Sequence, residues 1–134
     1  TNPRQNQKTA HARHSRVGTM WQMRAAGVFG ASSIVAGAAG AHGMGGLGKL
    51  EEPYAGIWKT AVQYQQFHTA ALLATPLATS PRARLVAGAS FASGIVLFSG
   101  SNYLVAYHRD RSYGRASPLG GSFFILGWLA LALL

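Results

Sequence analysis

Three histidines, His42, His68 and His108, are the residues of this chain whose type and spacing could hold a cofactor. Histidines on facing helices of a bundle can bind a haem iron or a metal ion through their ring nitrogens. If neighbouring helices run antiparallel, His42 and His108 lie near one end of the bundle and His68 lies deeper. The alternative is structural and commoner, with each ring hydrogen-bonded to a backbone carbonyl or to a serine or tyrosine hydroxyl. We therefore expect no cofactor and no metal, and keep the three histidines as candidates.

The chain has few groups that could act as catalysts. Its three acidic residues, Glu51, Glu52 and Asp110, all lie in predicted loops. No pair of carboxylates lies within an apolar stretch, so general acid–base chemistry and a carboxylate proton relay both lack their groups. The chain has no cysteine, which excludes thiol catalysis, disulfides and thiolate metal sites. We predict a protein that is not an enzyme.

The composition is that of a membrane protein. Apolar residues make up 49% of the 134 residues and charged residues only 11%, whereas a soluble domain carries about 25% charged residues. The net charge of +9 comes from basic residues at the N-terminus and between apolar runs. Membrane helices commonly carry such basic flanks, so the charge needs no nucleic acid partner and we expect none.

Four apolar stretches predict transmembrane helices at residues 21–44, 54–78, 85–107 and 117–134. About 20 predominantly apolar residues cross the hydrocarbon core, and short connections predict antiparallel neighbours. The predicted fold is therefore an all-α integral membrane four-helix up-down bundle. Residues 1–20 are polar and basic and lack apolar periodicity, which predicts a largely irregular N-terminal arm.

Small residues recur on one face of the first, third and fourth predicted helices. Such stripes let the backbones of membrane helices approach closely. We expect helix packing through Gly30, Gly37, Ala41, Ser90, Gly94, Ser101, Gly120 and Gly127.

The second predicted helix carries more polar side chains than any other apolar stretch. At 100° per residue Lys59, Gln63 and Gln66 fall on one face, whereas His68 falls on the opposite side. A charged group at the bilayer centre costs roughly 2.5–3.5 kcal/mol even on the mildest scale. These side chains must therefore face other helices, a pocket or the membrane interface, with Lys59 extending its amine towards the headgroups.

The N-terminal arm carries Arg4, Lys8, Arg13 and Arg16 and no acidic residue. We predict that these residues contact anionic lipid headgroups or an acidic partner surface. A basic, acid-poor N-terminus also resembles an organelle-targeting segment, although a basic tail that fixes orientation explains it as well. Seven basic residues on the side of the arm, against five on the other side, favour both termini on the cytoplasmic or matrix side.

Several local strings resemble those of one family. They are Gly37-Ala-Ala-Gly-Ala-His-Gly43, Ile57-Trp-Lys-Thr-Ala-Val-Gln-Tyr64 with His68, Leu97-Phe-Ser-Gly-Ser101 with Tyr103, and Pro118-Leu-Gly-Gly121 with Gly127-Trp128. In this order, over residues 25–134, the chain resembles the transmembrane protein 256 family, whose bacterial members carry the domain of unknown function 423. The resemblance implies a four-helix integral membrane protein and brings no established activity, substrate or cofactor. Two consecutive amides, Gln65 and Gln66, depart from the expected pattern.

These observations predict an accessory or structural subunit of a larger membrane complex, with membrane lipids and other membrane-protein subunits as partners. The targeting-like arm and the family's setting favour a respiratory assembly of the mitochondrial inner membrane, with a bacterial plasma membrane as the alternative. Two other functions stay open. One is a small transporter, or a lipid- or quinone-binding protein, with Lys59, Gln63, Gln66 and His68 as its polar pocket, and the other is a haem-binding bundle. Bound lipid is the one non-protein component we expect.

Overall fold

The computed structural model describes residues 3–134, with side chains for residues 3–10 and 20–134. Every regular element in this part of the chain is helical, which confirms the predicted all-α class for the described residues. The elements in chain order are α1 (Pro3–His42), α2 (Tyr54–Ala74), the 3-10 turn η1 (Thr75–Leu77), α3 (Pro81–Gly94), the π-helical turn η2 (Ile95–Ser99), α4 (Gly100–His108), the 3-10 helix η3 (Arg111–Ala116) and α5 (Ser117–Leu133).

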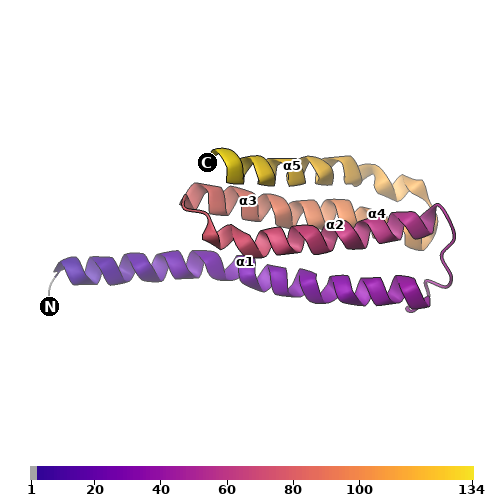
Figure 1. Ribbon diagram of the computed structural model, residues 1–134, viewed down its shortest axis with the longest axis horizontal. Helices are drawn as coiled ribbons and strands as arrows, with labels where there is room; N and C mark the ends of the chain where they lie inside the picture. Colours follow the sequence, from indigo (N-terminus) through magenta and orange to yellow (C-terminus); the bar gives the residue numbers. More distant parts are fainter. Residues whose placement is uncertain (1–2) are drawn as a thin grey trace.

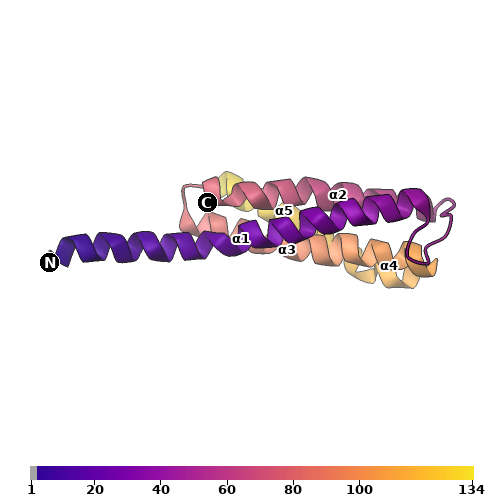
Figure 2. The same ribbon diagram turned by 90° about the horizontal axis from the view of Figure 1, so that it is seen from below.

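The helices lie side by side, and α3, η2 and α4 form one continuous rod (Figure 1 and Figure 2). α1 and this rod run in one direction, and α2 and α5 run in the opposite direction (Figure 1). α2 packs against α1 and α4, while α3 packs against α5. The core lies between α2, α3 and α5, where Leu72, Ala87, Phe91 and Phe124 are almost fully buried. α2 is therefore an inner helix, with α1 on one side and the α3–α4 rod on the other.

The π-helical turn η2 divides that rod into two halves with different partners. A wider turn changes the direction in which the side chains after it point. α3, before the turn, packs mainly on α5, and α4, after it, packs mainly on α2. Within the turn the fully buried Ser99 donates a hydrogen bond to the carbonyl oxygen of Ala61 on α2, at 2.8 Å. The turn thus attaches the rod to α2 at the point where the rod changes partner.

Three helices are long and apolar enough to cross a membrane: Met20–His42, Pro81–His108 and Arg111–Leu133. The second of these begins at Pro81, four residues before the predicted start at residue 85. The hydroxyl of Ser80 caps the helix by accepting a hydrogen bond from the backbone N–H of Ala83 at 3.3 Å. α2 has 21 residues and is long enough to span, but it is not in this group because its polar side chains lower its hydropathy. Length and composition thus support three spanning helices where the sequence predicted four.

The N-terminal arm is helical, which corrects our prediction of a largely irregular segment. α1 begins at Pro3 and continues without a break into the membrane-spanning part. Proline is favoured in the first turn of a helix, and Gln5, Lys8 and Ala10 are good helix formers. Once the apolar part of α1 is helical, each further residue extends the helix without a new nucleation step. The arm projects beyond the other helices as a single rod (Figure 1).

Glycine permits the close contact between α5 and the α3–α4 rod. A Cβ atom on Gly94 would collide with the ring of Phe124, and one on Gly127 would lie 2.6 Å from the ring of Phe91. A Cβ on Gly120 would collide with the backbone of η2. At these three predicted packing positions a larger residue would push the helices apart.

The other predicted packing residues lie at several kinds of position. A Cβ on Gly30 or Gly37 would be 3.7 Å from a side chain of α2, which is ordinary contact. Ser90 and Ser101 are buried. Ala41 is exposed near the end of α1 and lines a groove described below.

The glycine-rich loop between α1 and α2 is attached to the end of α4. Gly43 begins it with a φ of 65°, and a Cβ there would lie 2.9 Å from a backbone carbonyl oxygen, so the turn requires glycine. Leu47 is buried beneath the loop, and its carbonyl oxygen accepts a hydrogen bond from Arg109 Nη2 at 3.1 Å. The hydroxyl of Tyr54 donates to the carbonyl oxygen of Arg109 at 2.8 Å. These bonds hold the α1–α2 connection in place at this end of the bundle.

Candidate functional site

The polar side chains of the bundle collect on α2, on two opposite sides of the helix. Lys59, Gln63 and Gln66 are exposed on one side. His68 lies on the other side and is 5% exposed, beside Gln65, which is 4% exposed. The structure therefore does not bring the four predicted polar residues into one cluster. Its buried side holds a glutamine to which the sequence assigned no role.

Gln65 joins three helices through its side-chain amide. Nε2 donates to the carbonyl oxygen of Phe29 and to the hydroxyl of Ser32, both on α1 and both at 2.8 Å. Oε1 accepts a hydrogen bond from the hydroxyl of Tyr103 on α4, at 2.7 Å. Both amide hydrogens and the oxygen are thus paired, as burial in apolar surroundings requires. The one feature of the sequence that could have indicated its burial is its position four residues after Ala61, which places it on the apolar side of the helix.

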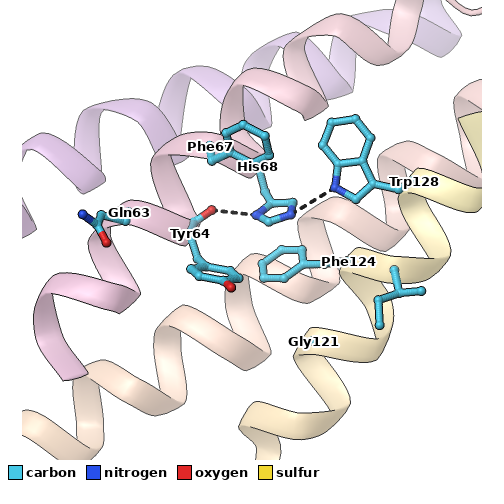
Figure 3. Close-up of a pocket in the computed structure, with 8 residues that line it drawn as sticks. Gln63, Tyr64, Phe67, His68, Gly121, Phe124 and Trp128 are labelled. Atoms are coloured by element: carbon cyan, nitrogen blue, oxygen red, sulfur yellow. Dashed lines mark hydrogen bonds between the residues drawn. The ribbon is translucent and has the colours of Figure 1, made fainter. Parts of the chain in front are cut away.

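His68 lies between α2 and α5 with both ring nitrogens engaged (Figure 3). The indole N–H of Trp128 donates to Nε2 at 3.3 Å, so Nε2 is an unprotonated acceptor. Nδ1 lies 2.9 Å from the carbonyl oxygen of Tyr64, which can only accept, so Nδ1 carries the hydrogen. The ring of Phe124 stacks on the imidazole, with 3.6 Å between ring centroids. These contacts select the neutral imidazole in a single tautomer.

An open groove of about 520 Å³ lies beside His68, between α2 and α5. Its walls are largely aromatic, and Gln63, Tyr64, Phe67, Phe124, Ile125 and Trp128 are among the residues that line it (Figure 3). The side-chain amide of Gln63 and the hydroxyl of Tyr64 have no hydrogen-bond partner among the residues that the structure describes. The groove therefore offers ring surfaces for stacking and two polar groups at its edge.

A second groove, of about 340 Å³, lies between α1 and α2. On α1 it is lined by the small residues Gly37, Gly40 and Ala41, and on α2 its lining includes Lys59 and Gln63. Gln63 lines both grooves, so the exposed side of α2 forms a ridge between them.

The other two candidate histidines lie apart from His68, each at the end of a helix. His42 is exposed at the end of α1, and His108 is exposed at the end of α4, where its ring stacks on Tyr113 at 4.6 Å. Within the described residues no three His, Asp, Glu or Cys side chains are grouped so as to hold a metal ion. A haem iron at His68 would have to displace the indole of Trp128 from Nε2.

The predicted contact residues of the arm are described only in part. Arg4 and Lys8 are exposed on the helical arm. Arg13 and Arg16 belong to the stretch whose side chains lie outside the described part of the structure.

Comparison with known proteins gives the chain a family. Residues 36–121 match the family described as "Protein of unknown function (DUF423)". Three similar relatives are the UPF0382 membrane proteins of Staphylococcus epidermidis, Haemophilus influenzae and Bacillus subtilis. The first is 41% identical over 103 residues, which cover 75% of this chain and 83% of the relative. The second is 39% identical over 74% of this chain and 80% of the relative. The third, YwdK, is 35% identical over 71% of this chain and 79% of the relative.

No solved structure matches the chain at a significant level. The family match includes the loop after α1, all of α2 and the α3–α4 rod. It therefore includes the polar residues on both sides of α2 and the α2 residues that line the two grooves. It confirms the resemblance to the domain of unknown function 423. The chain belongs to the DUF423 family of small membrane proteins.

Proposed function

We propose that this chain is a non-catalytic integral membrane protein with four transmembrane helices, and that it serves as a subunit of a larger membrane assembly. Three of the four spans are apolar enough on their own. α1 and the α3–α4 rod run in the same direction (Figure 1), so the chain has to return across the membrane between them. α2 makes that return, and its 21 residues at 1.5 Å each give about 31 Å, which matches a hydrocarbon core of about 30 Å.

The observation that carries the assembly proposal is a polar stripe on α2, formed by Lys59, Gln63 and Gln66. All three residues are exposed, and their spacing of four and then three residues places them along one side of the helix. The side chains of these residues have no hydrogen-bond partner among the described residues. In a bilayer core each unsatisfied polar group costs several kcal/mol, and lipid tails supply no partner. A neighbouring protein helix removes this cost, and a monomer surrounded by lipid does not.

A non-catalytic role is supported by what surrounds the buried histidine. The ring of His68 contacts aromatic side chains, a backbone carbonyl and an indole N–H. Glu51, Glu52 and Asp110 are exposed and lie outside the spanning part of α2. Among the described residues, the ring of His68 therefore has no carboxylate as a hydrogen-bond partner with which to share a proton.

The distribution of basic residues and the source of the relatives support a location. The end of the bundle with the arm, Arg24, Arg82 and Arg84 has no acidic residue, whereas all three acids lie at the other end. This bias favours the arm on the cytoplasmic side. The relatives named above are bacterial, which favours a plasma membrane over the mitochondrial inner membrane that the arm suggested. The helical arm remains compatible with an organelle, and a tagged chain located in its own cells decides between the two.

The assembly proposal is tested by the mass of the native particle. The chain is extracted from its own membrane in a mild detergent, washed with salt and sized, and whatever travels with it is identified. We expect a particle containing more protein than one 14.1 kDa chain. The double variant Gln63→Leu/Gln66→Leu should shift the chain to a smaller particle, whereas Leu126→Ala, an exposed change on α5, should not. A single chain in its detergent micelle, for the native sequence, refutes the proposal.

A second candidate function, binding of a planar apolar molecule such as a quinone, is supported by the aromatic groove between α2 and α5. Its volume of about 520 Å³ falls in the range of small-molecule sites, and Gln63 and Tyr64 can each donate a hydrogen bond at its edge. We expect a quinone to quench the fluorescence of Trp128 saturably in a variant with the other two tryptophans replaced. Gly121→Leu, which fills the groove, should abolish the quenching. Equal quenching in both proteins refutes this function.

A further inference from the structure

We infer that the partner on the α2 stripe is a second copy of this chain, packed against the first as a parallel two-fold dimer. The inference rests on the proposed function, because it names the occupant of the surface that the assembly proposal requires to be covered.

The chemistry of the stripe is self-complementary. Gln63 and Gln66 each carry two amide hydrogens and one carbonyl oxygen, so each can both donate to and accept from an identical side chain. A two-fold contact brings the same patch of both copies together. Glutamine side chains hydrogen-bond across membrane helices in this way. A second copy thus satisfies both amides with no further component.

The topology of the chain fixes the direction of the contact. Both copies insert with the same end facing the cytoplasm, because the same basic residues orient each of them. The two α2 helices therefore run parallel, with the two-fold axis along the membrane normal, and Gln63 and Gln66 each lie opposite their counterparts. Lys59 lies in the second turn of α2, close enough to the bundle end for its amine to reach the headgroups. The two lysines are therefore not forced together in the hydrocarbon core.

The shape beside the stripe fits a second helix. On the α1 side the stripe borders the groove of about 340 Å³ lined by Gly37, Gly40 and Ala41. Small residues of this kind let a neighbouring backbone approach closely, and membrane helix contacts combine them with polar side chains. Gly37 and Gly40 also pack on α2 within the chain, Gly40 against the ring of Trp58, whereas Ala41 is left exposed. The dimer covers Ala41 and the polar stripe together.

Cysteine cross-linking tests the contact directly, because the chain has no cysteine of its own. Gln66→Cys is placed on the stripe, and Leu126→Cys, exposed on α5, is the matched control. Native membranes containing each variant are oxidised, and the chain is sized without reducing agent. We expect Gln66→Cys to give a disulfide-linked band of two chains, identified as this chain alone by mass spectrometry. The control should stay at the size of one chain.

A second measurement uses the native surface. Dimerisation is followed in lipid bilayers by energy transfer between labelled chains as they are diluted in lipid. Two-fold symmetry gives each pair of opposed glutamines two reciprocal hydrogen bonds. Loss of one glutamine from the chain should therefore raise the dissociation constant by about eightfold, and Gln63→Leu/Gln66→Leu should raise it by about sixtyfold. An unchanged constant overturns the inference.

The outcomes separate this inference from the proposed function. Cross-linking of Gln66→Cys to a different protein overturns the second copy and leaves the assembly standing. Equal cross-linking of both cysteine variants shows random collision and overturns the dimer. No cross-link, together with a native particle of one chain, overturns both proposals.

Discussion

Replacing Gln65 by leucine should destabilise the bundle, although leucine is nearly the same size and more apolar. The change removes two hydrogen bonds to α1 and one to α4. On α1 the loss is limited, because the Ser32 hydroxyl also donates to the Phe29 carbonyl oxygen at 3.1 Å. On α4 the hydroxyl of Tyr103 loses the one side-chain partner that the described structure gives it.

The size of the effect follows from these contacts. Hydrogen bonds between membrane helices average about 0.6 kcal/mol each, so three of them contribute about 2 kcal/mol. A half-buried tyrosine hydroxyl left without a partner adds about 1 kcal/mol, the low end of the range for such groups. We therefore expect Gln65→Leu to lower the free energy of unfolding by about 3 kcal/mol. Tyr103→Phe should cost about 1–2 kcal/mol, and adding it to Gln65→Leu should cost less than the sum, because the orphaned hydroxyl is gone.

The assay is reversible unfolding in mixed micelles, at a dilution where the chain is monomeric. Gln66→Leu is the matched control, because it makes the same change one residue later on an exposed position. We expect the control to change the free energy of unfolding by less than about 0.5 kcal/mol. Equal destabilisation by the two variants, or none by Gln65→Leu, would refute the reasoning from burial and hydrogen bonding.

Three further predictions concern packing, the histidine and the charged loop. Gly120→Ala should lower the free energy of unfolding by about 1–3 kcal/mol, because the new Cβ meets the backbone of η2. The control Gly27→Ala should raise it by about 0.4–1 kcal/mol, because a Cβ there has no atom within 4 Å. Trp128→Phe should lower it by about 1 kcal/mol by removing the donor to His68 Nε2. The Nε2 signal in an NMR spectrum should shift, while Nδ1 keeps its hydrogen because the Tyr64 carbonyl oxygen still accepts it. Backbone and side-chain hydrogen bonds from a neighbouring serine hold the pKa of Asp110 below its ordinary value, so the loop is stabilised above that ordinary pKa and loses this contribution as the pH falls through the lowered one. An acid titration of amide exchange in this loop should show that loss, and Asp110→Asn should remove it.

The helices of the bundle could be predicted because long apolar runs leave few alternatives in a membrane. The arm was predicted incorrectly, since polar composition alone argues against a helix. Its extension depends on a helix already formed next to it, which no window confined to residues 1–20 contains. The start of α3 was missed for a similar reason, because Ser80 and Pro81 also fit a turn.

The candidate site was predicted only in part because it depends on neighbours distant in the chain. Periodicity separated Lys59, Gln63 and Gln66 from His68, as the exposures of these residues bear out. Periodicity could not supply Trp128, 60 residues after His68, as the hydrogen-bond donor to its Nε2. It also could not show which of two adjacent glutamines would find partners on two other helices.

The unbroken α1 helix has a consequence for what the arm can reach. Arg4 precedes Met20, the first residue of the apolar candidate span, by sixteen residues, so a straight helix places it about 24 Å beyond that residue. The screening length at physiological ionic strength is about 8 Å. The headgroup layer itself extends about 5–7 Å beyond the hydrocarbon. With α1 upright, Arg4 therefore lies about two screening lengths beyond the headgroups, where the surface charge of the lipid is strongly screened. For Arg4, the contact with anionic lipid that the sequence suggested therefore requires the helix to bend or lie down. Standing upright, the arm is a spacer of fixed length that presents positive charge to acidic surfaces arriving from the aqueous side.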